Sequence, residues 1–225
     1  MYQPHLFDEP ERVVAEHVTM VERDEDVSAV WQTVLDPEES IWLVERILTF
    51  DLSYATVVEL LAEMPTTNRE RAFATIIKNR TYHGGILASG AGLLKYGENG
   101  KGIGSRWYPA TLARRIRHIT ALRHCITFLV GDGLAVIAAH AQCNDTVFFI
   151  DPPYTVKGKG KRAGKRLYRY CDLDHEQLFA LAETMQGDYL MTYDVADEVR
   201  ELALRHRLEY RPIPMNNTHH ATMQE

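Results

Sequence analysis

An acid, two prolines and a tyrosine follow a short apolar run in the second half of the chain. Val147 to Ile150 are apolar, and Asp151-Pro152-Pro153-Tyr154 comes directly after them. Such a run is typical of a buried strand in a parallel sheet. Proline has no N–H and a fixed φ, so the strand must end at Asp151. We therefore expect Asp151 and Tyr154 at the carboxyl edge of a sheet, where open α/β folds bind ligands.

These four residues suit the recognition of a planar ring that carries an exocyclic amine. The Asp151 carboxylate and the carbonyls of Pro152 and Pro153 are acceptors for the two N–H protons of such an amine. The Tyr154 ring offers a face for stacking. A bare Asp-Pro-Pro is more simply read as a strand followed by a proline turn with a capping acid. The apolar strand before it and the tyrosine after it favour the functional interpretation.

Two further acids follow predicted strands earlier in the chain. A strand expected to be buried, 18–21, precedes Glu22, and a strand expected at 126–130 precedes Asp132. In a Rossmann-type sheet, an acid after the second strand accepts hydrogen bonds from a ribose diol, and Glu22 is placed for this role, with Asp24 as the alternative. Taken alone, this charge cluster is better explained as the start of the next helix, because acids favour helix N-termini.

Apolar residues at helical spacing predict that helices connect these strands. A last strand is expected at 189–194, and Asp174 is expected to cap the helix that precedes it. In that helix His175 is interpreted as structural. The predicted helices cover residues 11–16, 26–35, 39–48, 54–64, 69–78, 112–122, 134–142, 175–185 and 195–205.

Two segments combine glycines with basic residues. Residues 79–108 hold eight of the fourteen glycines, with basic and aromatic side chains between them, and residues 157–169 carry seven basic residues and no acid. Such segments suit phosphate contact and base stacking, although a basic run can also be a solvated loop. The residues predicted to contact nucleic acid are Arg80, Lys157, Lys159, Lys161, Arg162, Lys165 and Arg166.

The segment Phe148 to Tyr154, together with Asn79-Arg80 in its glycine-rich surroundings, resembles the DNA adenine methylase family of amino-methyltransferases. The resemblance implies a Rossmann-like sheet that binds S-adenosylmethionine. It also implies methyl transfer to the exocyclic amine of adenine in double-stranded DNA, after the base is flipped out. A cognate restriction endonuclease would be a functional partner of such an enzyme.

The resemblance also implies roles for individual residues. Tyr193 or Asp194 would form a wall of the target-base pocket. The catalytic residues would be Asp151, Pro152, Pro153 and Tyr154, and the cofactor-binding residues would be Glu22, Asp132 and Asp151. Two alternatives remain open: a catalytically inactive remnant that only binds DNA, and an amino-methyltransferase that acts on RNA or protein.

The expected organisation is a methyltransferase core made of residues 1–36 and 124–225, with a helical, loop-rich target-recognition insertion at 37–123. In the family, a glycine-rich turn follows the first strand, because glycine lets the backbone approach the methionine end of the cofactor. No glycine precedes Gly84 here. We therefore expect poor cofactor binding, and an exposed edge or apolar face beside strand 18–21.

The composition of the chain limits which classes of protein it can belong to. The chain has 225 residues, 45% of them hydrophobic, which is enough for one substantial core. No apolar run approaches the ~20 residues of a membrane span, and no signal peptide is recognised. Three cysteines without metal-like spacing favour a reduced, cytoplasmic protein without a metal site. The net charge of -6 does not by itself indicate a nucleic-acid binder, but binding needs only one basic face.

Overall fold

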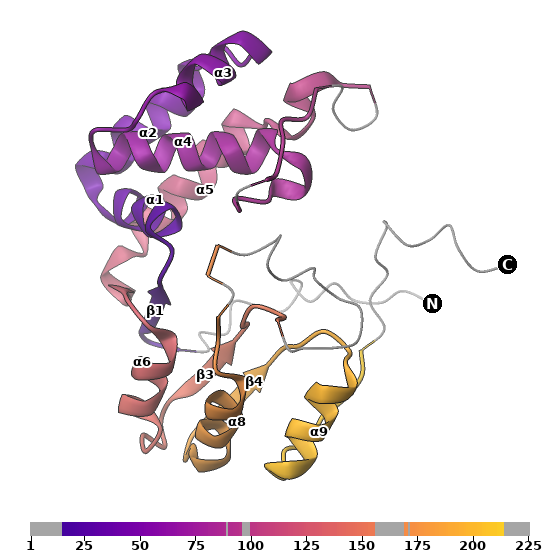
Figure 1. Ribbon diagram of the computed structural model, residues 1–225. Coiled ribbons are helices and arrows are strands. Elements are labelled where there is room, and N and C mark those ends of the chain that lie inside the picture. Colours follow the sequence, from indigo (N-terminus) through magenta and orange to yellow (C-terminus); the bar gives the residue numbers. More distant parts are fainter. Residues whose placement is uncertain (1–14, 89, 96–99, 156–168, 171, 214–225) are drawn as a thin grey trace, which may run out of the picture. The chain divides into compact units, whose positions relative to one another are not determined.

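The computed structural model describes residues 15–88, 90–95, 100–155, 169–170 and 172–213 (Figure 1). The chain divides into two compact units, Met1–Gly133 and Leu134–Glu225. Each contains helices and a pair of parallel strands, so the α/β fold class is confirmed. Most of the predicted helix 11–16 lies outside the described residues, and so do the six basic residues predicted as nucleic-acid contacts between 157 and 166.

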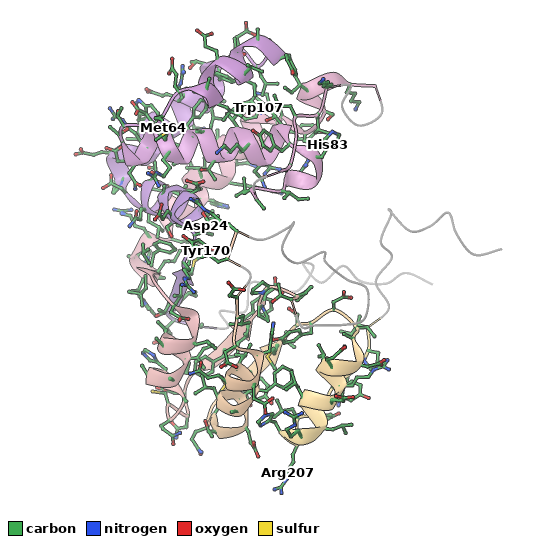
Figure 2. All side chains as sticks on the ribbon, viewed as in Figure 1. Asp24, Met64, His83, Trp107, Tyr170 and Arg207 are labelled. Atoms are coloured by element: carbon green, nitrogen blue, oxygen red, sulfur yellow. The ribbon has the colours of Figure 1, made fainter. Side chains whose placement is uncertain are left out.

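Side-chain caps start four of the α-helices described in the first unit, whereas the helix that begins at Pro109 has no side-chain cap. Asp24, labelled in Figure 2, accepts hydrogen bonds from two amides of the first helical turn, and Asp36 does the same for the next helix. Ser53 and Thr67 form capping boxes. Such caps satisfy amides that have no partner within the helix. The helices are α1 (Glu25–Leu35), α2 (Pro37–Thr49), α3 (Tyr54–Ala62), α4 (Asn68–Thr81) and α5 (Pro109–Ala121).

These helices pack around one apolar core. Leu43, Ile47, Val57 and Ile77 are fully buried, and the Phe73 ring beside them is 1% exposed. Three short 3-10 helices complete this unit: η1 (His83–Gly85), η2 (Gly102–Arg106) and η3 (Arg123–Cys125). The helices predicted at 26–35, 39–48, 54–64, 69–78 and 112–122 therefore contribute to one core.

The first unit also holds a two-stranded parallel sheet, β1 (Val18–Glu22) with β2 (Ile126–Val130). Helix α1 lies against it, and the Trp31 ring stacks on Phe128 with a centroid distance of 6.4 Å. The expectation of a buried strand at 18–21 is wrong, because Val18 is 46% exposed. The expected apolar exposure beside this strand is thus present, and Val130 adds to it at 53% exposure.

The second unit contains a second parallel pair, β3 (Val147–Ile150) with β4 (Asp188–Met191). Helices α8 (His175–Thr184) and α9 (Asp197–Arg205) pack beside the sheet, with Phe179 and Leu202 buried against Met191. Asp174 caps α8 as predicted, since its side chain accepts a hydrogen bond from the Gln177 amide. Helix α6 (Gly133–His140) leads into this unit.

Among the residues that the structure describes in the second unit, apolar side chains cover one face of the β3–β4 sheet. Partnered residues of parallel strands share a face, so Phe149 and Leu190 lie together on one side. Phe149 is 72% exposed and Leu190 is 58% exposed, whereas Ile150 on the other side is buried. The prediction of a strand buried on both faces is therefore wrong, because α8 and α9 supply apolar partners to one face only.

Other differences concern element ends and the joining of strands. The predicted strand 189–194 ends at Met191, and the predicted helix 54–64 ends at Ala62, near Pro65, which disfavours helical backbone in the residue before it. The described strands form two separate pairs rather than one sheet of four. The proposed division into a discontinuous core and an insertion stays a prediction. No described helix combines the length and apolar character needed to cross a bilayer.

Candidate functional site

Asp151 is the first residue after β3, at the carboxyl end of the strand. The strand ends where the sequence predicted, because the two prolines that follow cannot donate to a sheet ladder. The register pairs Ile150 with Met191, so Asp151 and Thr192 both follow directly after paired residues. The Thr192 amide donates to the Ile150 carbonyl at 3.0 Å and holds the two strand ends together.

Two hydroxyls gather on one oxygen of the Asp151 carboxylate. The Thr192 hydroxyl donates to Oδ1 at 2.5 Å, and the Tyr154 hydroxyl donates to the same oxygen at 2.8 Å. The two hydroxyl oxygens are 3.2 Å apart. Hydrogen bonds to an ionised acceptor are stronger than those between neutral groups, so this triangle fixes the carboxylate relative to the Tyr154 ring.

The two proline carbonyls of the expected acceptor fan differ in their hydrogen bonds. The Pro153 carbonyl accepts the Thr155 amide at 2.8 Å. A carbonyl oxygen can accept a second hydrogen bond, so the role of Pro153 as an acceptor for a ligand stays a prediction. No hydrogen bond to the Pro152 carbonyl is present among the described residues. The second oxygen of Asp151 and the Pro152 carbonyl are therefore the acceptors best placed for an amine.

Two aromatic rings stand beside these acceptors. The Tyr154 and Tyr193 ring centroids are 5.9 Å apart, with an angle of 33° between the planes. Tyr193 also contacts Phe179 in the apolar core of this unit, and a role of Tyr193 or Asp194 as a wall of a base pocket stays a prediction. Tyr154 is 37% exposed.

His175 links Tyr193 to Thr155, the residue that follows Tyr154. Its Nδ1 lies 2.9 Å from the Tyr193 hydroxyl, and its Nε2 lies 2.9 Å from the hydroxyl of Thr155, the residue after Tyr154. Burial lowers the pKa of His175, opposed by the nearby charge of Asp174. Burial also raises the pKa of Tyr193 far above its ordinary value, with a smaller contribution from Tyr154. Both groups are therefore neutral at pH 7.

The two acids expected at a ribose and an adenine lie at one edge of the β1–β2 sheet. Glu22 ends β1, and Asp132 comes two residues after β2, whose last residue pairs with Glu22. Oε1 of Glu22 accepts the amides of Arg23 and Asp24 at 2.7 and 2.8 Å. Asp24, the alternative candidate for the ribose contact, caps α1, so the interpretation of this acid as part of a helix start is confirmed. Glu22 and Asp132 belong to the first unit and Asp151 to the second.

Arg80 belongs to a cluster of three guanidinium groups. Burial lowers the pKa of Arg80, and the charges of Arg106 and Arg115 lower it further. No acidic partner for these three groups is present in the part of the chain that the structure describes. Arg106 donates to the Tyr82 carbonyl at 3.3 Å, and a Cβ at Gly85 would lie 2.8 Å from its Nη2. The glycine thus makes room for the guanidinium.

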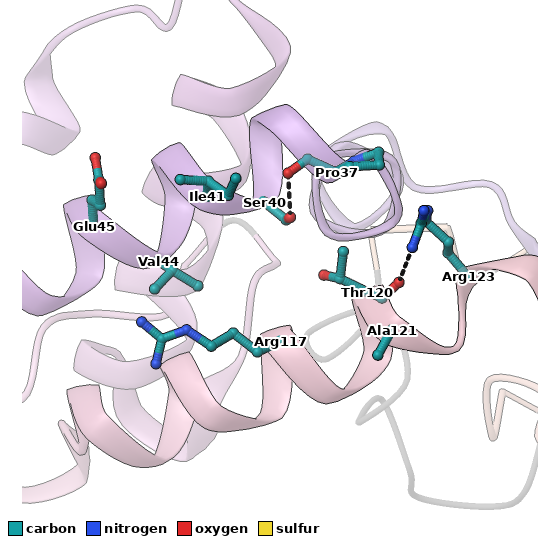
Figure 3. Close-up of a pocket in the computed structure, with 9 residues that line it drawn as sticks. All are labelled: Pro37, Ser40, Ile41, Val44, Glu45, Arg117, Thr120, Ala121 and Arg123. Atoms are coloured by element: carbon teal, nitrogen blue, oxygen red, sulfur yellow. Dashed lines mark hydrogen bonds between the residues drawn. The ribbon is translucent and has the colours of Figure 1, made fainter.

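A groove of about 370 Å³ lies between α2 and α5 (Figure 3). Apolar side chains such as Ile41 and Val44 line it, and Arg117 extends along it. It contains no pair of groups suited to acid–base or nucleophilic chemistry. Among the described residues, no group of three or more His, Cys, Asp or Glu side chains is arranged to hold a metal ion.

Thr192 and Thr155 were not identified as site residues from the sequence, and His175 was assigned a structural role only. The available signal for Thr192 was its position after an apolar strand that pairs in parallel with the Asp151 strand. Residues in that position meet at the same edge of a parallel sheet.

Neither a protein-family model nor a curated protein sequence matches this chain. Its function must therefore be inferred from its own residues and their geometry.

Proposed function

We propose that this protein methylates the exocyclic amine of adenine in double-stranded DNA, with S-adenosylmethionine as the methyl donor and a Rossmann-like core. The observation that carries the proposal is the Asp151 site. A carboxylate is held at a strand end by two hydroxyls, beside the ring of the partly exposed Tyr154. No covalent nucleophile or metal is needed, because the chemistry depends on positioning and electrostatics.

The acceptors match the demands of an amine that must act as a nucleophile. An adenine amine has two N–H donors, and the second oxygen of Asp151 and the Pro152 carbonyl can each accept one. Accepting both protons directs the nitrogen lone pair out of the ring plane, toward a methyl donor. On methyl transfer the amine would lose one N–H proton, and the Asp151 carboxylate would accept it. Tyr154 stacks on the flipped base.

Two groups of basic residues support duplex DNA as the substrate. Arg80, Arg106 and Arg115 form an uncompensated positive cluster in the first unit, where the sequence suggested target recognition. The second group is the basic run between 157 and 169, which follows the Asp-Pro-Pro-Tyr segment directly. Phosphate contacts of this kind position a protein on DNA without reading its sequence.

Part of a cofactor site fits the residues present. One oxygen of Glu22 remains for a ribose hydroxyl, and Asp132 lies at the same sheet edge. When bound, S-adenosylmethionine would supply an electrophilic methyl group. No residue before Gly84 is a glycine, so the turn that would admit the methionine end has no counterpart in this part of the chain.

That missing glycine turn favours a second candidate, a protein that binds DNA without methylating it. The basic clusters would be retained in such a protein, whereas Asp151 would have no substrate to orient. Methyl transfer separates the two candidates directly.

The test is incubation of the full chain with radiolabelled S-adenosylmethionine and plasmid DNA from a host without adenine methylation. We expect label in N6-methyladenine, and loss of more than nine-tenths of the rate in Asp151→Ala with DNA binding retained. Asp145→Ala is the matched control, because this exposed acid in the same unit has no contact with the site. Label in methylcytosine, or retention of the rate in Asp151→Ala, would refute the proposal. DNA binding without transfer would support the second candidate.

A further inference from the structure

Thr192 touches the centre of the proposed chemistry although it belongs to another strand. Its hydroxyl makes the shortest hydrogen bond to Asp151, at 2.5 Å, and its amide is anchored to the Ile150 carbonyl. The backbone anchor fixes where the hydroxyl stands. A serine at this position would keep the same donor, whereas valine would keep the shape and lose the donor.

The two oxygens of Asp151 are thereby made unequal. Oδ1 accepts from Thr192 and Tyr154, whereas no described group donates to Oδ2. A carboxylate on a single bond to Cβ otherwise rotates over a broad range of χ2. With Oδ1 held by two donors, the plane of the group is set and Oδ2 is presented for another donor.

We infer that Thr192 is a positioning residue that assigns the two carboxylate oxygens separate tasks: Oδ1 fixes the carboxylate and Oδ2 accepts the target amine. This inference rests on the proposed function, since it takes the amine as the ligand of Asp151. The hydroxyl acts through Asp151 and does not itself touch the base.

The rest of the network holds the ring side of the site in place for the same purpose. His175 joins Thr155 to Tyr193, and Tyr193 packs against both Tyr154 and Phe179. The Tyr154 hydroxyl also donates to the Thr192 hydroxyl at 3.2 Å, but the contacts through Thr155, His175 and Tyr193 do not involve Thr192. Removing the Thr192 hydroxyl should therefore disturb the orientation of the carboxylate more than the position of the aromatic rings.

The first experiment compares Thr192→Val with Thr192→Ser in the methyl-transfer assay. We expect the valine variant to lose about 10-fold to 100-fold in kcat, with little change in KM for DNA, because a small misplacement of a positioned group costs about this much. Serine should restore the rate to within about threefold. Thr184→Val is the control, since the Thr184 hydroxyl donates to a helix carbonyl of the same unit and not to Asp151.

The second experiment does not depend on methyl transfer. Adenosine and purine riboside, which lacks the amine, are titrated into the protein and followed at the Tyr154 and Tyr193 ring resonances by NMR. Wild-type protein and Thr192→Ser should bind adenosine more tightly than purine riboside, whereas Thr192→Val and Asp151→Ala should lose most of this preference.

The wild-type result decides which idea fails. A wild-type protein that neither methylates DNA nor prefers adenosine would overturn the proposed function and the role of Thr192 with it. A wild-type protein that prefers adenosine, with an equal preference in Thr192→Val, would leave the proposed function standing and overturn the role of Thr192.

Discussion

Gly187 fixes the start of β4, and its replacement by alanine should destabilise the unit that carries the candidate site. A Cβ at this position would fall onto the Thr146 carbonyl oxygen and would lie 2.9 Å from the Cys143 carbonyl oxygen. Both contacts are with backbone atoms, which cannot move aside as the end of a flexible side chain can. Gly187 also precedes Asp188, the first residue of the β3–β4 register.

The magnitude follows from the kind of contact. Forcing an extra methyl group into well-packed surroundings costs about 1–3 kcal/mol, and occasionally more. Two backbone carbonyls at one Cβ position put Gly187→Ala at the upper end of that range, at about 3 kcal/mol. Gly133→Ala is the matched control. Its Cβ would meet no atom within 4 Å, so we expect a change of at most about 0.5 kcal/mol.

The assay exploits the distribution of tryptophans. Trp31, Trp42 and Trp107 all belong to the first unit, so their fluorescence during urea unfolding reports on that unit. Hydrogen exchange of amides in β3 and β4, measured by mass spectrometry, reports on the second. We expect Gly187→Ala to lower protection in β3 and β4 by a factor of about 100, with an unchanged fluorescence midpoint. Equal protection in Gly187→Ala and wild type would contradict the argument from the close backbone contact.

Three further outcomes are expected. Hydrogen bonds to Glu183 and to Glu176 raise the pKa of His206. The His206 side chain therefore stabilises the fold below about pH 6.5, and this stabilisation is lost as the pH rises through the raised pKa of His206. His206→Gln should thus lower the thermal midpoint more at pH 6 than at pH 8.5. Calorimetric titration should show weak S-adenosylmethionine binding by residues 1–225, and a micromolar dissociation constant would mean that another segment replaces the glycine turn. Replacing Lys159, Lys161, Arg162 and Lys165 together by Gln should weaken binding to all DNA sequences alike. The slope of log binding constant against log salt concentration should become shallower by about 0.9 per lost phosphate contact. An unchanged slope would mean that the basic run is a solvated loop.

Much of the local structure could be predicted, because its causes are local. The charge cluster that contains Asp24 was interpreted as the start of a helix and Asp174 as a cap, and each of these two side chains caps the helix that follows it. Prolines after Asp151 end β3 where expected. These features depend on hydrogen bonds and backbone angles within a few residues of one another, and the sequence displays them directly.

The contacts that build the candidate site could not be predicted in the same way, because they join residues about 20 to 40 positions apart. Thr192 and Tyr193 are both β-favouring, and for that reason they extended the predicted strand beyond Met191. In the structure their side chains turn to Asp151 and His175 instead. The register of β3 with β4 brings Thr192 to Asp151, and strand periodicity alone does not specify it.

The same limit explains the error about burial. The apolar run at Val147 to Ile150 has no alternation, which is typical of a strand covered on both faces. The helices of its unit cover the Ile150 side only, and Phe149 on the other face is exposed. The sequence shows that both faces are apolar, but it does not show which segment supplies the partner for each.

The residues named in the proposal are divided between the two units, so their contributions can be tested separately. Asp151, Thr192, Tyr154 and Tyr193 all belong to the second unit, so the proposed discrimination between adenosine and purine riboside would depend on that unit. Glu22, expected to contact a ribose, and Arg80, expected to contact a phosphate, belong to the first unit. Amine recognition with poor cofactor binding would therefore place the deficiency in the first unit, whereas good cofactor binding without amine recognition would place it at Asp151 and Thr192.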